Sequence, residues 1–171
     1  MHYTFTLLEN VYMEAHAYFQ KFGQLESAGY IFARTSTTED EVRLIGRKFV
    51  PVDEADVIDR SEVGVSIDSR SFMRALRHAD ETQQCLIFVH SHPGNFDCFS
   101  EKDDREEPPF FRTAYIRAKS MQPRASVVFQ GDGRVFAGGR KSFALVIEDG
   151  DGAGKGPSFP CSIRQVSKRK Q

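Results

Sequence analysis

The sequence predicts a single α/β domain in which a mixed β-sheet is flanked by helices. Its 171 residues fit one domain of ordinary size, and a hydrophobic fraction of 40% with a charged fraction of 27% is typical of a globular protein. Segments with helical spacing of apolar residues alternate with segments typical of strands. From Asp149 the composition changes, so we expect a domain over residues 1–148 and a flexible Gly-rich linker with a basic tail over 149–171.

The first half of the chain is predicted to contain one helix and two strands. Apolar residues recur at helical spacing over Leu8–Phe22, and Gly23 is a suitable C-cap. Strands are expected over Glu26–Arg34 and Val42–Val50, the second of them ended by a proline. An acidic loop is predicted over residues 53–56.

The second half continues the alternation. A helix is predicted over Ser66–Asp80, with Ser69 as its N-cap. The apolar run Cys85–Val89 is typical of a strand covered on both faces, and it leads directly into His90. A further helix is expected over Phe110–Ser120, with two prolines near its start. The remaining strands are predicted at Ala125–Phe129, Arg134–Ala137 and Phe143–Ile147, with a hairpin turn at Gly131–Gly133.

Charge and cysteine content argue against several classes of protein. Lys and Arg number 23 and Asp and Glu number 24, a net charge of -1 that does not suit a nucleic-acid-binding protein. No apolar run approaches the roughly 18 residues that a membrane span needs, and residues 1–5 lack the features of a signal peptide. Cys85, Cys98 and Cys161 are odd in number and form no CxxC motif. We therefore expect a cytoplasmic protein with no nucleic-acid or membrane partner.

A candidate metal site follows the apolar strand. His90 and His92 are two residues apart, so both imidazoles leave the same face of a strand and can hold one metal ion. Taken alone, the pair is more often two ordinary histidines at a strand end. Ser100 and Asp103 have the spacing of a helix N-cap and a first-turn carboxylate, which is itself a sufficient reason for their presence. Both functions are compatible, and two imidazoles with one carboxylate are a ligand set of catalytic zinc sites.

Such a site needs a base, and Glu26 is the candidate. It opens an apolar strand, where a carboxylate can be partly desolvated and can accept a proton from water activated by the metal. The alternative is a solvated glutamate at a strand end, and for Glu26 taken by itself that alternative is clearly favoured.

Together these residues resemble the motif of the JAMM (MPN-plus) metalloproteases. That motif consists of a glutamate, a long gap, His-Ser/Thr-His, seven residues, a serine, two residues and an aspartate. The chain matches it at Glu26, His90-Ser91-His92, Ser100 and Asp103, and the order of the surrounding elements from Leu8 to about Ile147 is similar to the family core.

The resemblance implies a fold and a set of roles. The fold would be a JAMM/MPN (cytidine-deaminase-like) sandwich with a mixed sheet flanked by helices. His90, His92 and Asp103 would bind one Zn²⁺ per chain, Glu26 would be the general acid and base, and Ser100 would stabilise the oxyanion. Ser91 points the other way by strand alternation and is given no catalytic role.

Family members cleave isopeptide or peptide bonds after ubiquitin or ubiquitin-like proteins, and this short chain resembles the compact prokaryotic branch. That branch implies a ubiquitin-like protein or its conjugate as substrate, E1- and E2-like enzymes as further partners, and a place in anti-phage conjugation systems or in sulfur-carrier processing. The alternatives are an inactive binding scaffold and a metallohydrolase of small amides. The acidic run after Ser100 departs from the family pattern, and within it Asp104 is a competing ligand.

Overall fold

A computed structural model of the chain describes its backbone over most of the predicted domain and two short segments beyond it. The described residues are 2–93, 100–117, 122, 124–130, 142–148, 159–162 and 164–166. Within these ranges, no helix combines the length and the apolar character needed to cross a membrane.

The described strands form one mixed sheet of eight strands and a separate two-stranded hairpin, which confirms the predicted fold class. The order across the large sheet is β10-β1-β3-β2-β6-β7-β8-β9. Pairing is parallel for β1 with β3 and with β10, and for β6 with β7; the other neighbours in this sheet are antiparallel. These strands are β1 (His2–Leu8), β2 (Ala28–Thr37), β3 (Glu41–Pro51), β6 (Cys85–His92), β7 (Arg124–Gln130), β8 (Ser142–Glu148), β9 (Phe159–Ser162) and β10 (Arg164–Val166).

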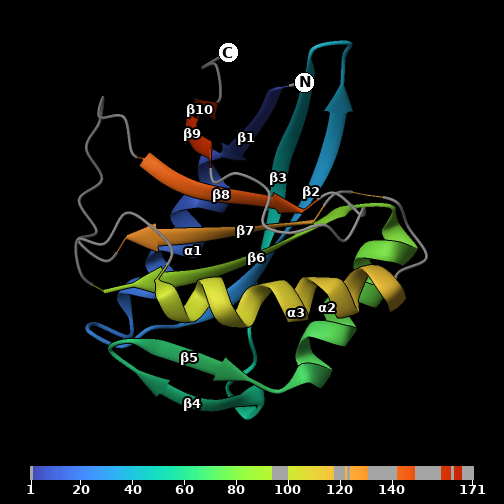
Figure 1. Cartoon of the computed structure of the whole chain (residues 1–171). Coiled ribbons are helices and arrows are strands. Elements are labelled where there is room, and N and C mark those ends of the chain that lie inside the picture. The colour runs from blue at the N-terminus through green and yellow to red at the C-terminus, as the bar shows by residue number, and fades with distance from the viewer. Residues whose placement is uncertain are drawn as a thin grey trace.

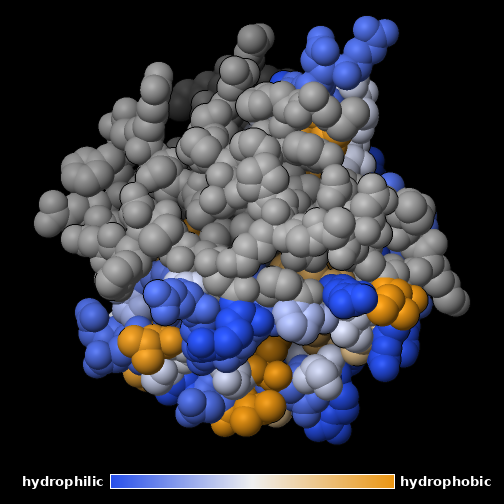
Figure 2. Space-filling model, in the orientation of Figure 1, coloured by the Kyte–Doolittle hydropathy of each residue, from blue (hydrophilic) through white to orange (hydrophobic). Residues whose placement is uncertain are grey.

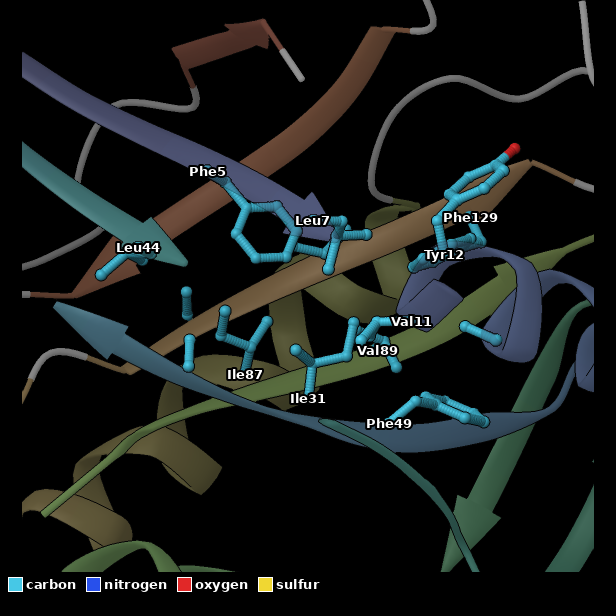
Figure 3. Close-up of a cluster of buried hydrophobic side chains, with 14 of the residues drawn as sticks. Phe5, Leu7, Val11, Tyr12, Ile31, Leu44, Phe49, Ile87, Val89 and Phe129 are labelled. Carbon is cyan, nitrogen blue, oxygen red and sulfur yellow. The ribbon is translucent and has the colours of Figure 1, made fainter. Parts of the chain in front are cut away.

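Helices cover both faces of this sheet. Helix α1 (Glu9–Gln20) lies behind the sheet in Figure 1, whereas α2 (Ser69–Thr82) and α3 (Glu101–Arg117) lie in front of it. The α1 side holds the larger apolar cluster, in which Val11 and Phe19 of the helix pack with strand residues such as Ile31 and Ile87 (Figure 3). Strand alternation places the even-numbered residues of β2 and β6 on the opposite face.

The second apolar cluster lies on that opposite face. Phe72 and Leu76 of α2 pack there with Tyr30 and Phe32 of β2 and with Leu86 of β6. His90 and His92 follow Leu86 at even spacing, so they emerge from β6 on the side of α2 and α3. The two clusters therefore cover both faces of β6, as its continuous apolar sequence predicts.

Three predicted boundaries are wrong at the start of an element. Residues 2–8 form β1, so the first helix begins at Glu9 and not at Leu8; Phe5 and Leu7 are fully buried against the sheet. Helix α2 is capped by Asp68, whose carboxylate accepts from the Arg70 N–H at 2.8 Å, and not by Ser69.

The third wrong boundary is that of α3. This helix begins at Glu101 and not at Phe110, because Ser100 and Asp103 form a capping box that starts it. Pro108 and Pro109 consequently lie inside the helix, where they remove two backbone N–H donors. This early start brings the acidic run of the sequence onto the helix that faces the histidines.

A small hairpin that the sequence analysis did not predict follows the acidic loop. Residues 54–56 form a short 3-10 helix, η1 (Glu54–Asp56), and then β4 (Val57–Ser61) pairs with β5 (Gly64–Ile67) in antiparallel fashion. The hairpin lies below α3 in Figure 1. Its contact with the start of β2 is the hydrogen bond from the Glu26 N–H to the Ser61 carbonyl, at 2.8 Å.

The C-terminal part of the chain is described in pieces. The predicted turn at Gly131–Gly133 and the strand over Arg134–Ala137 lie outside the described residues, and β8 corresponds to the last predicted strand. Within the segment predicted as a linker and tail, β9 pairs with β8 and β10 pairs with β1. The rest of that segment is not described, so the domain boundary at residue 148 stays a prediction.

Candidate metal centre and active site

Three side chains that could bind a metal ion converge where β6 ends and α3 begins. The Nε2 atoms of His90 and His92 are 3.2 Å apart. Carboxylate oxygens of Asp103 lie 3.4 Å from Nε2 of His90 and 3.3 Å from Nε2 of His92. Among the described residues, these three form the group in which all candidate ligand atoms lie within 4.8 Å of one another.

The two histidines are rigidly placed because both are buried. Their exposed fractions are 2% for His90 and 5% for His92, and both sit in a strand that is paired on either side, with β2 and with β7. Burial lowers the pKa of His90, and this effect outweighs the nearby Asp103 carboxylate. His90 is therefore neutral at physiological pH and retains a nitrogen lone pair for a metal.

Asp103 is oriented by the cap that starts α3. Its Oδ2 accepts from the backbone N–H and from the hydroxyl of Ser100, each at 2.7 Å, and its own N–H donates to the Ser100 Oγ at 3.2 Å. Burial opposes ionisation of Asp103, but its contacts with His90 and His92 hold the pKa of the carboxyl well below its usual range. Asp103 is thus both the first-turn carboxylate of the capping box and a candidate ligand, and the hydroxyl of Ser100, the N-cap, is directed at that carboxylate.

Glu26 lies beside this group without being part of it. Its Oε1 is 3.8 Å from Nε2 of His92, and the residue is only 6% exposed. Burial raises the pKa of Glu26 from its ordinary value of 4.5 to about 7, an increase that His92 opposes and Asp103 reinforces. A carboxylate with this pKa can both accept and return a proton near neutral pH.

Pairing of β2 with β6 brings Glu26 close to the histidines, although these residues are far apart in the sequence. In the antiparallel pairing of β2 with β6, Ala28 lies opposite His90, so the residues preceding β2 reach the level of His92. Two hydrogen bonds extend this pairing: Ser27 N–H donates to the Ser91 Oγ at 3.0 Å, and Ser91 N–H donates to the Ser27 carbonyl at 2.9 Å. Ser91 therefore positions the residue next to Glu26, a role that the sequence analysis missed.

A pocket opens between the hairpin and α3 beside these groups. Its volume is about 240 Å³, and it is lined by Glu26, His90 and Asp103, by Gly64 of β5 and by Lys102 and Glu107 of α3, among others. Lys102 lies so close to Gly64 that a Cβ there would be 2.2 Å from its Nζ. A side chain at residue 64 would displace the flexible end of Lys102, so glycine there lets the Lys102 ammonium lie against the hairpin.

The acidic residues after Ser100 lie on more than one face of helix α3. Asp103 and Glu107 face the histidines, Glu106 is exposed but lines the pocket, and Glu101 is exposed. The side chain of Asp104, the predicted competitor, lies outside what the structure describes, as do Cys98 and the rest of residues 94–99. Cys85 is fully buried in β6, and its thiol is directed away from the histidines because it is odd-numbered on that strand.

The donor set fits zinc in a catalytic rather than a structural site. Two imidazole nitrogens and one carboxylate are three protein ligands, which leave a fourth position of a tetrahedral zinc for water or substrate. The pocket is lined by two of these three candidate ligands, His90 and Asp103, and by the buried carboxylate of Glu26.

Comparisons with known proteins bear on the family and the fold of the chain. Residues 9–130 match the family model described as prokaryotic homologues of the JAB domain, which confirms the resemblance carried by the motif. The fold is similar to the solution structure of protein DSY2949 from Desulfitobacterium hafniense, with a TM-score of 0.54 and 15% identity over 96% of each chain. At that identity the likeness shows the fold alone. No curated protein matches the chain.

Proposed function

Because the chain belongs to the prokaryotic homologues of the JAB domain, we propose that it is a zinc-dependent metalloprotease that cleaves isopeptide or peptide bonds after the C-terminal glycine of a ubiquitin-like protein. The family includes metallohydrolases, and the described residues hold a possible metal site. The observation that carries the proposal is the convergence of His90, His92 and Asp103, with the buried Glu26 3.8 Å from His92.

His90, His92 and Asp103 would hold the metal. A bound zinc ion supplies a Lewis acid, which polarises the scissile carbonyl and makes water more acidic. Glu26 accepts the proton of the attacking water and then delivers it to the leaving amine, so that the C–N bond breaks into a carboxylate and an amine. Ser100 orients Asp103 through its backbone N–H and its hydroxyl. The hydroxyl is also the candidate donor for the oxyanion, a role in which its single proton turns from Asp103 to the substrate.

The surroundings of the site support a protein substrate. The pocket has a volume of about 240 Å³, which is sufficient for the small glycine residue at the end of a ubiquitin-like tail. The hairpin beside it exposes two apolar side chains, Ile58 at 71% and Val63 at 76%. Figure 2 shows apolar side chains scattered among charged ones on the face of the molecule that carries the hairpin and α3. Such a surface can dock a folded partner whose C-terminal tail enters the pocket.

Two matched variants test the proposal. The substrate is a ubiquitin-like protein that ends in glycine and carries a C-terminal extension, and zinc content is measured on the same preparations. Glu26→Gln is expected to keep the metal and the fold while turnover falls on the order of 10²–10⁴-fold, because an amide cannot accept the proton. His92→Ala is expected to lose both zinc and turnover. Glu14→Gln, an exposed glutamate on α1, is the control for a charge lost far from the site.

The alternatives give different results in the same assay. An inactive scaffold binds the ubiquitin-like protein without cleaving it, and a small-amide hydrolase cleaves a panel of small amides but not the fusion. Near wild-type turnover of Glu26→Gln with zinc retained would show that Glu26 is not the base.

A further inference from the structure

Helix α3 brings a second carboxylate to the metal site. Glu107 follows Asp103 by four residues and therefore lies on the same face of the helix. While Asp103 faces the Nε2 atoms of both histidines, Oε1 of Glu107 is 3.8 Å from Nδ1 of His90, on the other side of that imidazole ring. One helical turn thus contacts both nitrogens of His90.

Glu107 is itself held in place from the sheet. The hydroxyl of Ser126 donates to Oε1 of Glu107 at 2.7 Å. Ser126 is fully buried on β7, where it lies opposite Phe88 in the parallel pairing with β6. The same oxygen of Glu107 therefore faces both a sheet hydroxyl and the His90 ring, and its side chain is only 12% exposed.

We propose that Glu107 is a positioning residue for the metal centre: held by Ser126, it accepts a hydrogen bond from Nδ1–H of His90 and so presents Nε2 of that ring to the metal. The inference rests on the proposed metal site and adds to it a residue outside the family motif. The separation of 3.8 Å is about 1 Å longer than a hydrogen bond. A small movement of one carboxylate closes this gap once the metal holds Nε2.

The physical reason is the choice of tautomer. A neutral imidazole carries its proton on either nitrogen, and only the tautomer protonated at Nδ1 has its lone pair on Nε2, which is the atom that faces His92 and Asp103. A carboxylate beside Nδ1 stabilises that tautomer and makes the ring a stronger ligand. A simpler role for Glu107, as an anchor of α3 to β7, predicts an effect on stability but none on the tautomer.

The experiment therefore measures metal affinity and tautomer, and not cleavage. Zinc affinity of the metal-free full chain is determined by competition with a chromophoric chelator for wild type, Glu107→Gln, Ser126→Ala and the double variant. Glu101→Gln, at an exposed position of the same helix that does not line the pocket, is the control for loss of one negative charge. Long-range ¹H–¹⁵N correlation spectra of the zinc-loaded wild type report which nitrogen of His90 carries the proton.

Glu107→Gln is expected to weaken zinc binding roughly 10–100-fold, with Glu101→Gln within about twofold of wild type. Ser126→Ala is expected to weaken binding less, and the double variant to be no weaker than Glu107→Gln, because the serine acts through the glutamate. In zinc-loaded wild type, His90 is expected to be protonated at Nδ1.

Each contrary result has a distinct meaning. Zinc affinity of Glu107→Gln equal to wild type, or a His90 bound through Nδ1, overturns the inference while leaving the proposed protease intact. A wild type that binds no zinc overturns both. Where Glu107→Gln does not fold, the wild-type tautomer and the affinity of Ser126→Ala still decide the matter, since Nδ1 protonation with weakened binding supports the inference and the absence of either overturns it.

Discussion

Ser27 and Ser91 are joined by a reciprocal pair of backbone-donated hydrogen bonds. The Ser27 N–H donates to the Ser91 hydroxyl at 3.0 Å, and the Ser91 N–H donates to the Ser27 carbonyl at 2.9 Å. Both residues are buried, and each is adjacent in sequence to a residue of the site: Glu26 on one side, His90 and His92 on the other. The serine between the two ligand histidines thus links them to the proposed base.

This link predicts the effect of two substitutions at Ser91. Ser91→Ala leaves a buried N–H of Ser27 without its acceptor and is expected to lower the free energy of unfolding by about 1–3 kcal/mol. Turnover should fall as well, because Glu26 is less firmly placed, while zinc content stays at the wild-type level. Ser91→Thr keeps the hydroxyl and should lose less of both. Denaturant unfolding and zinc analysis check the prediction, and equal losses in the two variants would contradict it.

The raised pKa of Glu26 predicts a pH-dependent stability of the metal-free protein. The folded state disfavours the ionised carboxylate, so Glu26 costs nothing below its unfolded pKa of 4.5, an increasing amount up to about pH 7, and a constant amount above that. Glu26→Gln removes this cost. Its melting temperature in the presence of a chelator should equal that of wild type near pH 4.5 and exceed it by a constant margin above pH 7. A difference that does not change with pH would contradict the assignment, and Glu14→Gln is the matched control.

The thiol of Cys85 is expected to resist modification in the folded protein. It is fully buried, and burial raises its pKa to about 12, so that the reactive thiolate is scarce at pH 8. Peptide mapping by mass spectrometry after iodoacetamide treatment should find Cys85 unmodified in native protein and alkylated in urea. Rapid alkylation of Cys85 under native conditions would indicate that β6 opens readily or is not the central strand of the core.

Deletion of residues 149–171 is expected to leave the core folded. Residues 5–129 already form two apolar clusters, one on each face of the large sheet, and β9 and β10 lie at the two edges of that sheet. The truncated chain should unfold cooperatively and bind zinc as the full chain does, although two newly exposed strand edges should make it aggregate more readily. Thermal unfolding and light scattering measure the two effects. Loss of the cooperative transition would show that the tail belongs to the domain.

Local pattern in the sequence determined the candidate metal ligands and the elements that carry them. A strand has a period of two, so His90 and His92 had to share a face whatever the rest of the fold, and the Ser100 and Asp103 spacing is satisfied within one helical turn. The apolar run of β6 and the stripe of α2 were likewise apparent from periodicity. The start of α3 was misjudged because the prolines suggested a helix boundary, whereas the capping box eight residues earlier is the stronger local signal.

Only the tertiary structure decided which distant residues join this centre. Glu26 reaches His92 because β2 pairs with β6 in one register, Glu107 reaches His90 because α3 packs across the sheet, and Ser126 supports it from the parallel neighbour β7. The position of the hairpin over the site and the parallel pairing of β1 with β3 were likewise decided only by the tertiary structure. Such contacts depend on strand register and layer packing, which arise from long-range burial of apolar surface, and for that reason no short stretch of the chain encodes them.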